Sequence, residues 1–195
     1  MPAAALQTDG RPLADLTRAI FGEALSMDEL FARVEAVEPY LTTMPSPSAI
    51  WVGSVGYERH KDHRIFARRL RETGIERLVD GRELPISRRR GYAKTALSNA
   101  MAEVGIEYVH AKALGNPKPY RDLYKSGRVD EGRRHYNRYL LDEQRDALVD
   151  LVSLLREKRS ALMCVEHDAQ VCHRAVILEA LRTELGLELD ICEVP

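Results

Sequence analysis

The sequence has little cysteine and no long hydrophobic run. Its three cysteines, Cys164, Cys172 and Cys192, are an odd and sparse number that suits a reducing cytoplasm better than a disulfide scaffold. No apolar stretch approaches the roughly 20 residues that cross a bilayer, so we expect no membrane span. The first residues combine neither a basic segment nor an apolar one, so we expect no secretory signal. The sequence therefore predicts a cytoplasmic protein without membrane contact.

The composition is that of a folded globular chain. Hydrophobic residues make up 45% and charged residues 30% of the sequence, which excludes a disordered or collagen-like chain. With 195 residues the chain is long enough for one domain, or for one domain plus a small extra element. A chain of this length buries about 70% of its unfolded surface, so its core needs neither a metal ion nor a disulfide.

Charge is distributed unevenly along the chain, although the net charge is only -1. Residues 1–48 carry a net charge of −4, residues 49–138 of +9 and residues 139–195 of −6. A central basic block of this size is typical of a face that attracts phosphate or nucleic acid. A solvated basic surface paired with the acidic flanks has the same count, so the count alone leaves both interpretations open.

The N-terminal segment predicts a small helical element that precedes the main domain. Ser26 and Glu29 have the spacing of a capping box, in which each side chain covers a free backbone amide. Hydrophobic residues then recur at helical spacing, at Leu30, Val34, Val37 and Leu41. A Pro-Ser-Pro-Ser stretch at residues 45–48 ends this pattern and predicts a stiff linker. We expect residues 1–48 to be a helical extension that docks on the main domain or mediates self-association or partner docking.

From residue 49 onward, short apolar runs alternate with helical patterns. The runs predict strands at residues 50–55, 77–80, 106–109, 161–165 and 187–194. Gly74, Gly105 and Gly186 each stand between a helical pattern and the next strand, which is typical of a left-handed helix cap. Strands that alternate with helices imply parallel βαβ units. We therefore predict a three-layer α/β sandwich with a mostly parallel sheet over residues 49–195.

Polar side chains follow four of these strands. Ligands of such sheets bind beyond the carboxyl ends of the strands, so we expect these residues around one pocket at a common edge. The candidates for acid–base or nucleophilic catalysis are Glu58, Asp80, His110, Cys164 and Glu166. The candidates for ligand binding are Tyr57, Arg82, Ser87, Arg88, Lys94, Cys172, His173 and Arg174. Loops are commonly polar, so no single residue of this set indicates a pocket. The indication is that all of these residues are expected at the same edge of the sheet.

Two basic segments that contain tyrosine flank this expected pocket. Arg88, Arg89 and Arg90 are followed by Tyr92 and Lys94, a combination suited to phosphate contact and base stacking. Residues 118–139 interleave arginine and lysine with tyrosine, which is typical either of a nucleic-acid surface or of a helix with half-buried tyrosines. Nucleic acid or nucleotide is therefore the partner we expect, with a solvated basic face as the alternative.

The segment 164–174 is compatible with three chemistries. A metal site would use Cys164, Cys172 and His173, but adjacent Cys-His ligands do not have zinc-finger or zinc-ribbon spacing and no fourth ligand is indicated. We therefore expect no metal and no cofactor. Cys164 would be a thiolate nucleophile if the nearby helix start lowered its pKa, and is otherwise a small core residue. His173 and Arg174 stand where the next helix begins, which favours a phosphate-binding site.

Together these motifs resemble the family catalogued as domain of unknown function 488. The shared motifs are Gly-Tyr-Glu, Val-Asp-x-Arg, Pro-x-Ser-Arg, Gly-aromatic-x-Lys, Tyr-x-His, Leu-Gly, Cys-x-Glu and Cys-His-Arg. They stand in this order at residues 56–58, 79–82, 85–88, 91–94, 108–110, 114–115, 164–166 and 172–174. The resemblance covers about residues 50–195 and implies an α/β sandwich, but no established reaction.

The Val-Asp-x-Arg strand and the late cysteine loop also resemble sulfurtransferase domains of the rhodanese type. Those domains wrap a short loop of backbone amides around the thiolate, whereas Arg174 lies ten positions after Cys164 here. We therefore predict a protein that binds or processes a phosphate-bearing ligand. Nucleic acid or nucleotide is the ligand class that we favour. The alternatives are a thiol-dependent, sulfurtransferase-like enzyme that uses Cys164 and a non-catalytic binding or adaptor protein.

Overall fold

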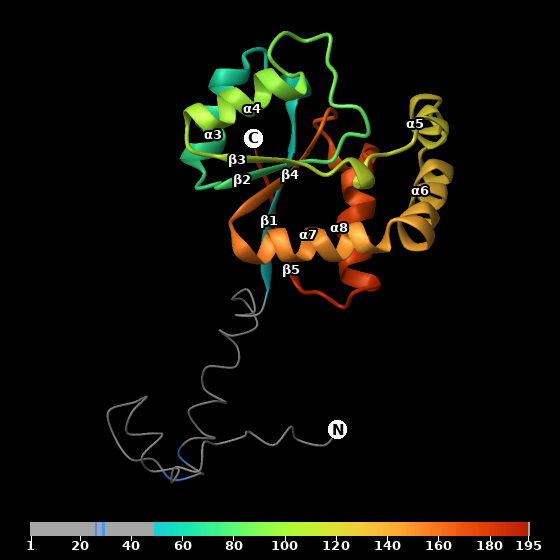
Figure 1. Ribbon diagram of the computed structural model, residues 1–195. Coiled ribbons are helices and arrows are strands. Elements are labelled where there is room, and N and C mark those ends of the chain that lie inside the picture. The colour runs from blue at the N-terminus through green and yellow to red at the C-terminus, as the bar shows by residue number, and fades with distance from the viewer. Residues whose placement is uncertain (1–25, 27–28, 30–48, 195) are drawn as a thin grey trace. The chain divides into compact units, whose positions relative to one another are not determined.

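The computed structural model describes residues 49–194 together with Ser26 and Glu29 (Figure 1). The Ser26 N–H and hydroxyl donate to Glu29 Oε2 at 2.8 and 2.7 Å, and the Glu29 N–H donates to Ser26 Oγ at 3.3 Å. These bonds confirm the predicted capping box. The rest of the predicted helical extension, and with it the predicted docking role, lies outside the described residues.

Strands and helices alternate through residues 49–194 as the sequence predicts. The strands are β1 (Ile50–Gly56), β2 (Arg77–Asp80), β3 (Glu107–His110), β4 (Ser160–Cys164) and β5 (Leu189–Glu193). The α-helices are α3 (His63–Glu72), α4 (Lys94–Glu103), α5 (Lys118–Lys125), α6 (Val129–Glu143), α7 (Arg145–Glu157) and α8 (His173–Thr183). Short 3-10 helices, η1 (Tyr57–Arg59), η2 (Lys112–Leu114) and η3 (Ala169–Val171), follow β1, β3 and β4. None of the described helices has the length and apolar character to span a bilayer.

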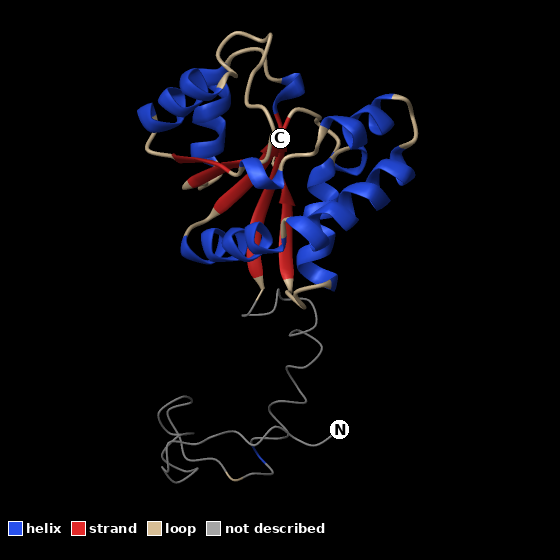
Figure 2. Ribbon diagram, turned by 45° about the vertical axis from the view of Figure 1, so that its right-hand side comes forward, coloured by secondary structure: helices blue, strands red, loops and turns tan. Residues whose placement is uncertain are grey.

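The five strands form one parallel sheet in the order β3-β2-β4-β1-β5. Helices α3 and α4 cover one face of the sheet, and α6, α7 and α8 cover the other (Figure 2). Each face has its own apolar cluster: Phe66 and Met101 belong to the first, Leu151 and Ile177 to the second. The predicted three-layer α/β sandwich is therefore confirmed.

Local sequence signals mark the start of α3 and the ends of three helices. In α3 the Asp62 carboxylate accepts hydrogen bonds from the backbone N–H groups of Arg64 and Ile65 at 2.8 and 3.0 Å. These two bonds lower the pKa of Asp62 below its ordinary value. Gly74, Gly105 and Gly186 have φ angles of 79°, 73° and 63°, so the predicted left-handed helix caps are confirmed.

The central strand β4 brings the carboxyl ends of its neighbours together. Cys164 pairs with Gly56 on β1, and Met163 pairs with Asp80 on β2. The chain after β4 then passes directly over Gly56, where a Cβ atom would lie 1.8 Å from the Glu166 carbonyl oxygen. A glycine at position 56 is therefore what allows the segment after Cys164 to lie against the edge of the sheet.

Candidate functional site

A pocket of about 380 Å³, which we call the main pocket because several of the predicted site residues gather there, opens at the carboxyl edge of the sheet. Its floor comes from the end of β4 and the start of α8, and its wall comes from α5 and the segment that precedes it. Leu84, Ile86, Val165 and Val171 line the pocket and are exposed. A concave site of this volume that combines apolar lining with a few polar groups has the usual character of a small-ligand site.

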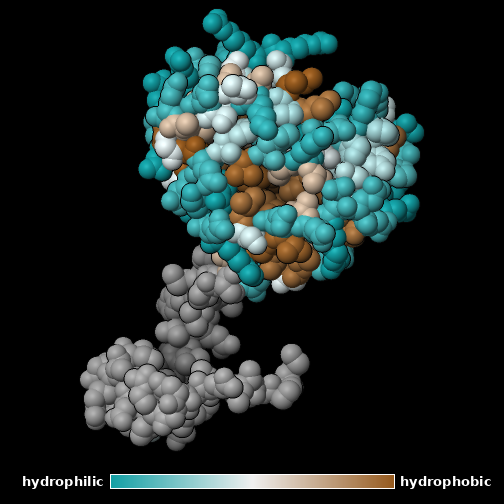
Figure 3. All heavy atoms as spheres, in the orientation of Figure 1, coloured by the Kyte–Doolittle hydropathy of each residue, from teal (hydrophilic) through white to brown (hydrophobic). Residues whose placement is uncertain are grey.

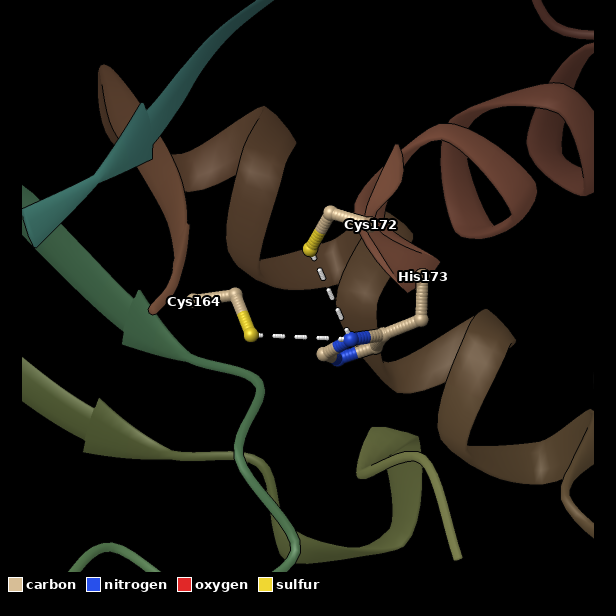
Figure 4. A group of neighbouring side chains, drawn as sticks. All are labelled: Cys164, Cys172 and His173. Carbon is tan, nitrogen blue, oxygen red and sulfur yellow. Dashed lines mark hydrogen bonds between the residues drawn. The ribbon is translucent and has the colours of Figure 1, made fainter. Parts of the chain in front are cut away.

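Three side chains on the floor converge on one another (Figure 4). The Sγ atom of Cys164 lies 3.5 Å from His173 Nδ1, and the Sγ atom of Cys172 lies 3.6 Å from the same nitrogen. All three side chains are buried. The Cys164 Sγ also lies 3.2 Å from Oε2 of Glu166, so a carboxyl group adjoins the thiols. We call Cys164, Cys172 and His173 the thiol–imidazole cluster.

A backbone carbonyl fixes the orientation of the His173 ring. The Nε2 atom of His173 lies 2.7 Å from the carbonyl oxygen of Gly81, which can only accept a hydrogen bond. Nε2 is therefore the protonated nitrogen, and Nδ1 is directed at the two sulfur atoms. The ring of Tyr136 packs edge-on against His173, with 5.4 Å between the ring centroids.

The electrostatics of the cluster favour ionisation of one thiol over the other. Burial opposes a charge on Cys172, but its interactions with Cys164 and His173 outweigh burial and lower the pKa of Cys172. The interaction with Cys172 and burial both raise the pKa of Cys164. Burial first, and then the charge of Cys172, raise the pKa of Glu166. Burial lowers the pKa of His173, but the charge of Cys172 more than reverses this, so the pKa of His173 is raised.

Asp80 and Arg82 form a buried ion pair beside the cluster. Arg82 Nε donates to Asp80 Oδ1 at 2.8 Å and Nη2 donates to Oδ2 at 2.5 Å. The remaining Arg82 nitrogen, Nη1, donates to the Tyr57 hydroxyl and the Tyr92 carbonyl at 3.3 and 2.9 Å. Arg82 lines the pocket, as do the predicted binding residues Cys172 and His173, but every one of its side-chain nitrogens has a protein partner. Asp80 lies behind it, and Tyr108 donates a further hydrogen bond to Asp80 Oδ2.

The predicted residues of the β1 end and the basic loop lie outside the lining of this pocket. Tyr57 is buried and stacks on Tyr92 at a centroid distance of 4.4 Å. The Tyr57 hydroxyl donates to Ser87 Oγ at 3.3 Å, so both residues hold the loop in place. Glu58 accepts a hydrogen bond from the His167 backbone N–H at 3.2 Å. Arg88 and Lys94 are exposed on the loop and at the start of α4 respectively.

Arg174 lies underneath the segment that follows β4. Its side chain is fully buried, and Nη2 donates to the carbonyl oxygens of Glu166 and His167 at 2.7 and 3.1 Å. Its Nε and Nη1 atoms have no hydrogen-bond partner among the described residues. Arg174 therefore supports the floor of the pocket, and its charge helps to lower the pKa of Cys172.

His110 lies at a second, smaller cavity of about 250 Å³. This cavity lies between the end of β3 and helix α7, where Figure 3 shows hydrophobic residues at the centre of the face drawn. The His110 Nε2 atom lies 2.9 Å from the carbonyl oxygen of Arg82. The structure therefore places His110 near the loop of Arg82 but outside the lining of the main pocket.

The wall of the pocket contains residues that sequence reasoning did not single out. Asn116 and Glu83 line the pocket, and Asn116 is buried with no partner for its Oδ1 atom among the described residues. Arg121, Tyr124 and Lys125 also line it, and they belong to the second basic segment that the sequence indicated. Asn116 stands in a short segment between a turn and a helix, and nothing in the local pattern marks it as a site residue.

The fold and this pocket define a three-layer α/β protein with a thiol–imidazole cluster at the carboxyl edge of a parallel sheet. The chain belongs to the family described as Domain of unknown function DUF488, whose family model matches residues 61–181. The predicted family resemblance is confirmed, and the matched range includes the Asp80–Arg82 pair and the whole cluster. The glycine-tyrosine-glutamate motif at residues 56–58 precedes the match. The comparisons found no matching curated protein and no matching solved structure.

Proposed function

We propose that the protein binds and processes a phosphate-bearing ligand, a nucleotide or a nucleic-acid strand, in the main pocket. The observation that carries this proposal is the pairing of a basic wall with the thiol–imidazole cluster across one cavity. Arg121 on the wall donates to Glu83 Oε2 and to the Asn116 carbonyl at 2.9 and 3.0 Å. Lys125 is exposed and makes no hydrogen bond or ion pair with the described residues. Lys125 is therefore the cation most available to a phosphate group.

Other wall residues favour a nucleotide over a small phosphorylated metabolite. The Asn116 Oδ1 and the Tyr124 hydroxyl are buried atoms without partners among the described residues. Such groups are costly to leave unsatisfied, and a nucleobase offers both N–H donors and acceptors. The exposed apolar side chains Leu84 and Ile86 at the same pocket suit the flat face of a base.

A thiol-dependent reaction is the second candidate function, and it would use Cys172. Cys172 is the N-cap of α8 and adjoins His173 and Arg174, whose interactions with it help to lower its pKa, so Cys172 is the better candidate for a nucleophile. All three cysteines are free thiols, in keeping with our proposal that the protein works in the reducing cytoplasm. A third possibility is a non-catalytic adaptor. An experiment that measures both binding and turnover distinguishes these two candidates from a protein that processes nucleotides or nucleic acid.

The experiment measures fluorescence anisotropy of labelled single- and double-stranded DNA and RNA over a series of salt concentrations. Each lysine that contacts a phosphate contributes about 0.7–0.9 to the slope of log affinity against log salt. We expect Lys125→Ala to weaken binding and to reduce this slope by about that amount. Lys118→Ala is the matched control, because Lys118 stands on the same helix but is paired with Asp122 at 2.6 Å and lies outside the pocket.

Two results would contradict the proposal. One is the absence of salt-sensitive binding to any of these nucleic acids or to mononucleotides near physiological ionic strength. The other is an equal loss in the Lys125→Ala and Lys118→Ala proteins, which would assign binding to general charge and not to the pocket. Turnover of the bound oligonucleotides, followed by gel electrophoresis, separates an enzyme from an adaptor.

A further inference from the structure

The spacing of the thiol–imidazole cluster matches the ligand shell of a small tetrahedral ion. The Cys164 Sγ, Cys172 Sγ and His173 Nδ1 atoms all lie within 4.8 Å of one another. The two sulfur-to-nitrogen distances are 3.5 and 3.6 Å. Zinc bonds of about 2.3 Å to sulfur and about 2.05 Å to nitrogen, at a tetrahedral angle, separate sulfur from nitrogen by about 3.6 Å.

Hydrogen bonds do not account for both sulfur-to-nitrogen contacts, since only one thiol can donate to His173 Nδ1 and Cys164 Sγ can donate to Glu166 Oε2 instead. The Gly81 carbonyl holds the proton of His173 on Nε2, so Nδ1 offers one lone pair, and two thiols converge on it. A single cation between the three atoms satisfies all of them at once. The bond from Nε2 to a backbone carbonyl is also the support that metal-binding histidines usually have, because it fixes the tautomer and the ring orientation.

We propose that Cys164, Cys172 and His173 bind one zinc ion, with the fourth coordination position open to the main pocket. Two thiolates and one imidazole are ligands that zinc prefers, whereas magnesium and calcium prefer oxygen. Three protein ligands with one open position are the pattern of catalytic zinc sites, and all three residues line the pocket. The site is independent of the proposed phosphate-bearing ligand, because its geometry involves only these residues.

The local backbone explains why two adjacent residues can both be ligands. Cys172 is the N-cap of α8 and has extended backbone angles, with φ at −127° and ψ at 153°. His173 is the first residue of the helix, so the chain turns between them and both side chains reach the same point (Figure 4). The sequence expectation of no metal rested on the spacings of zinc fingers and ribbons, which do not cover a turn of this kind, and on the lack of a fourth ligand, which a site with an open position does not need.

Zinc binds thiolates, so Cys164 and Cys172 each lose one proton to solvent when the ion enters. When bound, the ion would supply Lewis-acid activation of a water molecule at the open position.

The test measures metal content and ligand-field spectra of the full chain purified without an affinity metal. We expect about one zinc per chain by elemental analysis, and a thiolate-to-cobalt charge-transfer band when cobalt replaces zinc. Cys164→Ser and Cys172→Ser should each reduce this band by about half and lower zinc affinity more than about tenfold. Cys192→Ser is the matched control, since Cys192 is exposed on β5, and it should retain the full band.

If a variant fails to fold, measurements on the wild-type protein still test the zinc proposal. A chain that contains no zinc, whose melting temperature is unchanged by added zinc, and whose cobalt spectrum lacks the sulfur band would overturn the proposal. So would iodoacetamide labelling of Cys172 at the same rate with and without zinc, because a bound ion shields its thiolate ligands. These readouts do not depend on nucleic-acid binding, so this proposal and the proposed function can fail separately.

Discussion

Asp80 and Arg82 carry opposite charges and are buried beside the pocket. Their side chains are 0% and 4% exposed, and the two groups meet through paired hydrogen bonds. Burial opposes the charge of Arg82, but the bonds and charge of Asp80 outweigh it and raise the pKa of Arg82. A pair of this kind stabilises little in comparison with apolar groups, yet it is costly to break because one buried charge then remains.

At the level of single residues, we predict how removing one charge of the Asp80–Arg82 pair changes the stability of the protein. Asp80→Asn should lower the free energy of unfolding by about 3–5 kcal/mol, because Arg82 is left buried without its counter-ion. Glu83→Gln is the control: it removes a carboxylate from the half-exposed pair with Arg121, which contributes about 0–1 kcal/mol. Urea denaturation measures both. Equal losses in the two variants would show that burial does not govern the Asp80–Arg82 pair.

Single residues in the sequence carried part of the information about the site. Cys164, Cys172 and His173 were recognisable as chemically active residues, but their mutual distances depend on how α8 docks against β4. Arg174 looked like a free anion ligand because it stands at a helix start, whereas the structure gives two loop carbonyls to its Nη2 atom. Asn116 had no recognisable signal, since its role comes from burial without a partner, which is a property of the folded chain.

The basic loop between β2 and α4 shows how one element separates residues that look equivalent in sequence. Arg89 Nη1 donates to the carbonyl oxygens of Tyr57, Glu58 and His60 at 3.1, 2.5 and 2.7 Å, so this arginine fastens the loop to the η1 turn. Arg88 and Arg90 are exposed and make no hydrogen bond or ion pair with the described residues. Of the three, these two are therefore the ones available to a phosphate backbone.

For this loop we predict a difference within the arginine triplet. Replacing Arg88 and Arg90 together with alanine should flatten the salt slope of nucleic-acid binding by about 1.4–1.8, which is 0.7–0.9 for each residue. The stability of the domain should stay within about 0.5 kcal/mol of wild type, because these side chains are on the surface. The control replaces Arg68 and Arg71, which are exposed on α3, and removes the same charge. An equal change of slope in the control would refute a role for the loop.

The elements themselves were largely predictable because apolar runs and glycine caps are local signals. Residues 118–139 were harder, since interleaved tyrosine and arginine fit either a binding surface or a packed helix. The packed-helix interpretation is confirmed for part of the segment, and the binding surface stays a prediction. Tyr136 on α6 is fully buried and donates to the Leu114 carbonyl at 2.5 Å, whereas Tyr124 on α5 lines the pocket. Which tyrosine packs and which lines a cavity depends on the docking of two helices, and local sequence does not encode that docking.

On the scale of the whole molecule, residues 49–194 contain two apolar layers. One lies between the sheet and α3–α4 and the other between the sheet and α6–α8, and their members among the described residues all follow position 49. The division of the chain near residue 48 remains a prediction. We expect the segment 49–195 to unfold in one cooperative transition, with a midpoint within a few degrees of the full chain.

Thermal denaturation, monitored both by circular dichroism and by the fluorescence of Trp51, tests this expectation. Coincident transitions by both probes support an independent domain. A segment 49–195 that unfolds without cooperativity, while the full chain is cooperative, would mean that residues 1–48 complete the fold. The full chain under the same conditions is the control for both probes.

The strand order has a consequence for how the molecule is made. β1 and β2 share no backbone ladder, since β4 lies between them and pairs with both. Residues 50–80 leave the ribosome long before residue 160, and although β2 can pair with β3, β1 awaits both of its partners, β4 and β5, from the last fifth of the chain. Such distant pairing makes folding slow and leaves strand edges open to other chains meanwhile. Because β4 also delivers Cys164, the sheet and the chemistry at its edge are completed in the same late event.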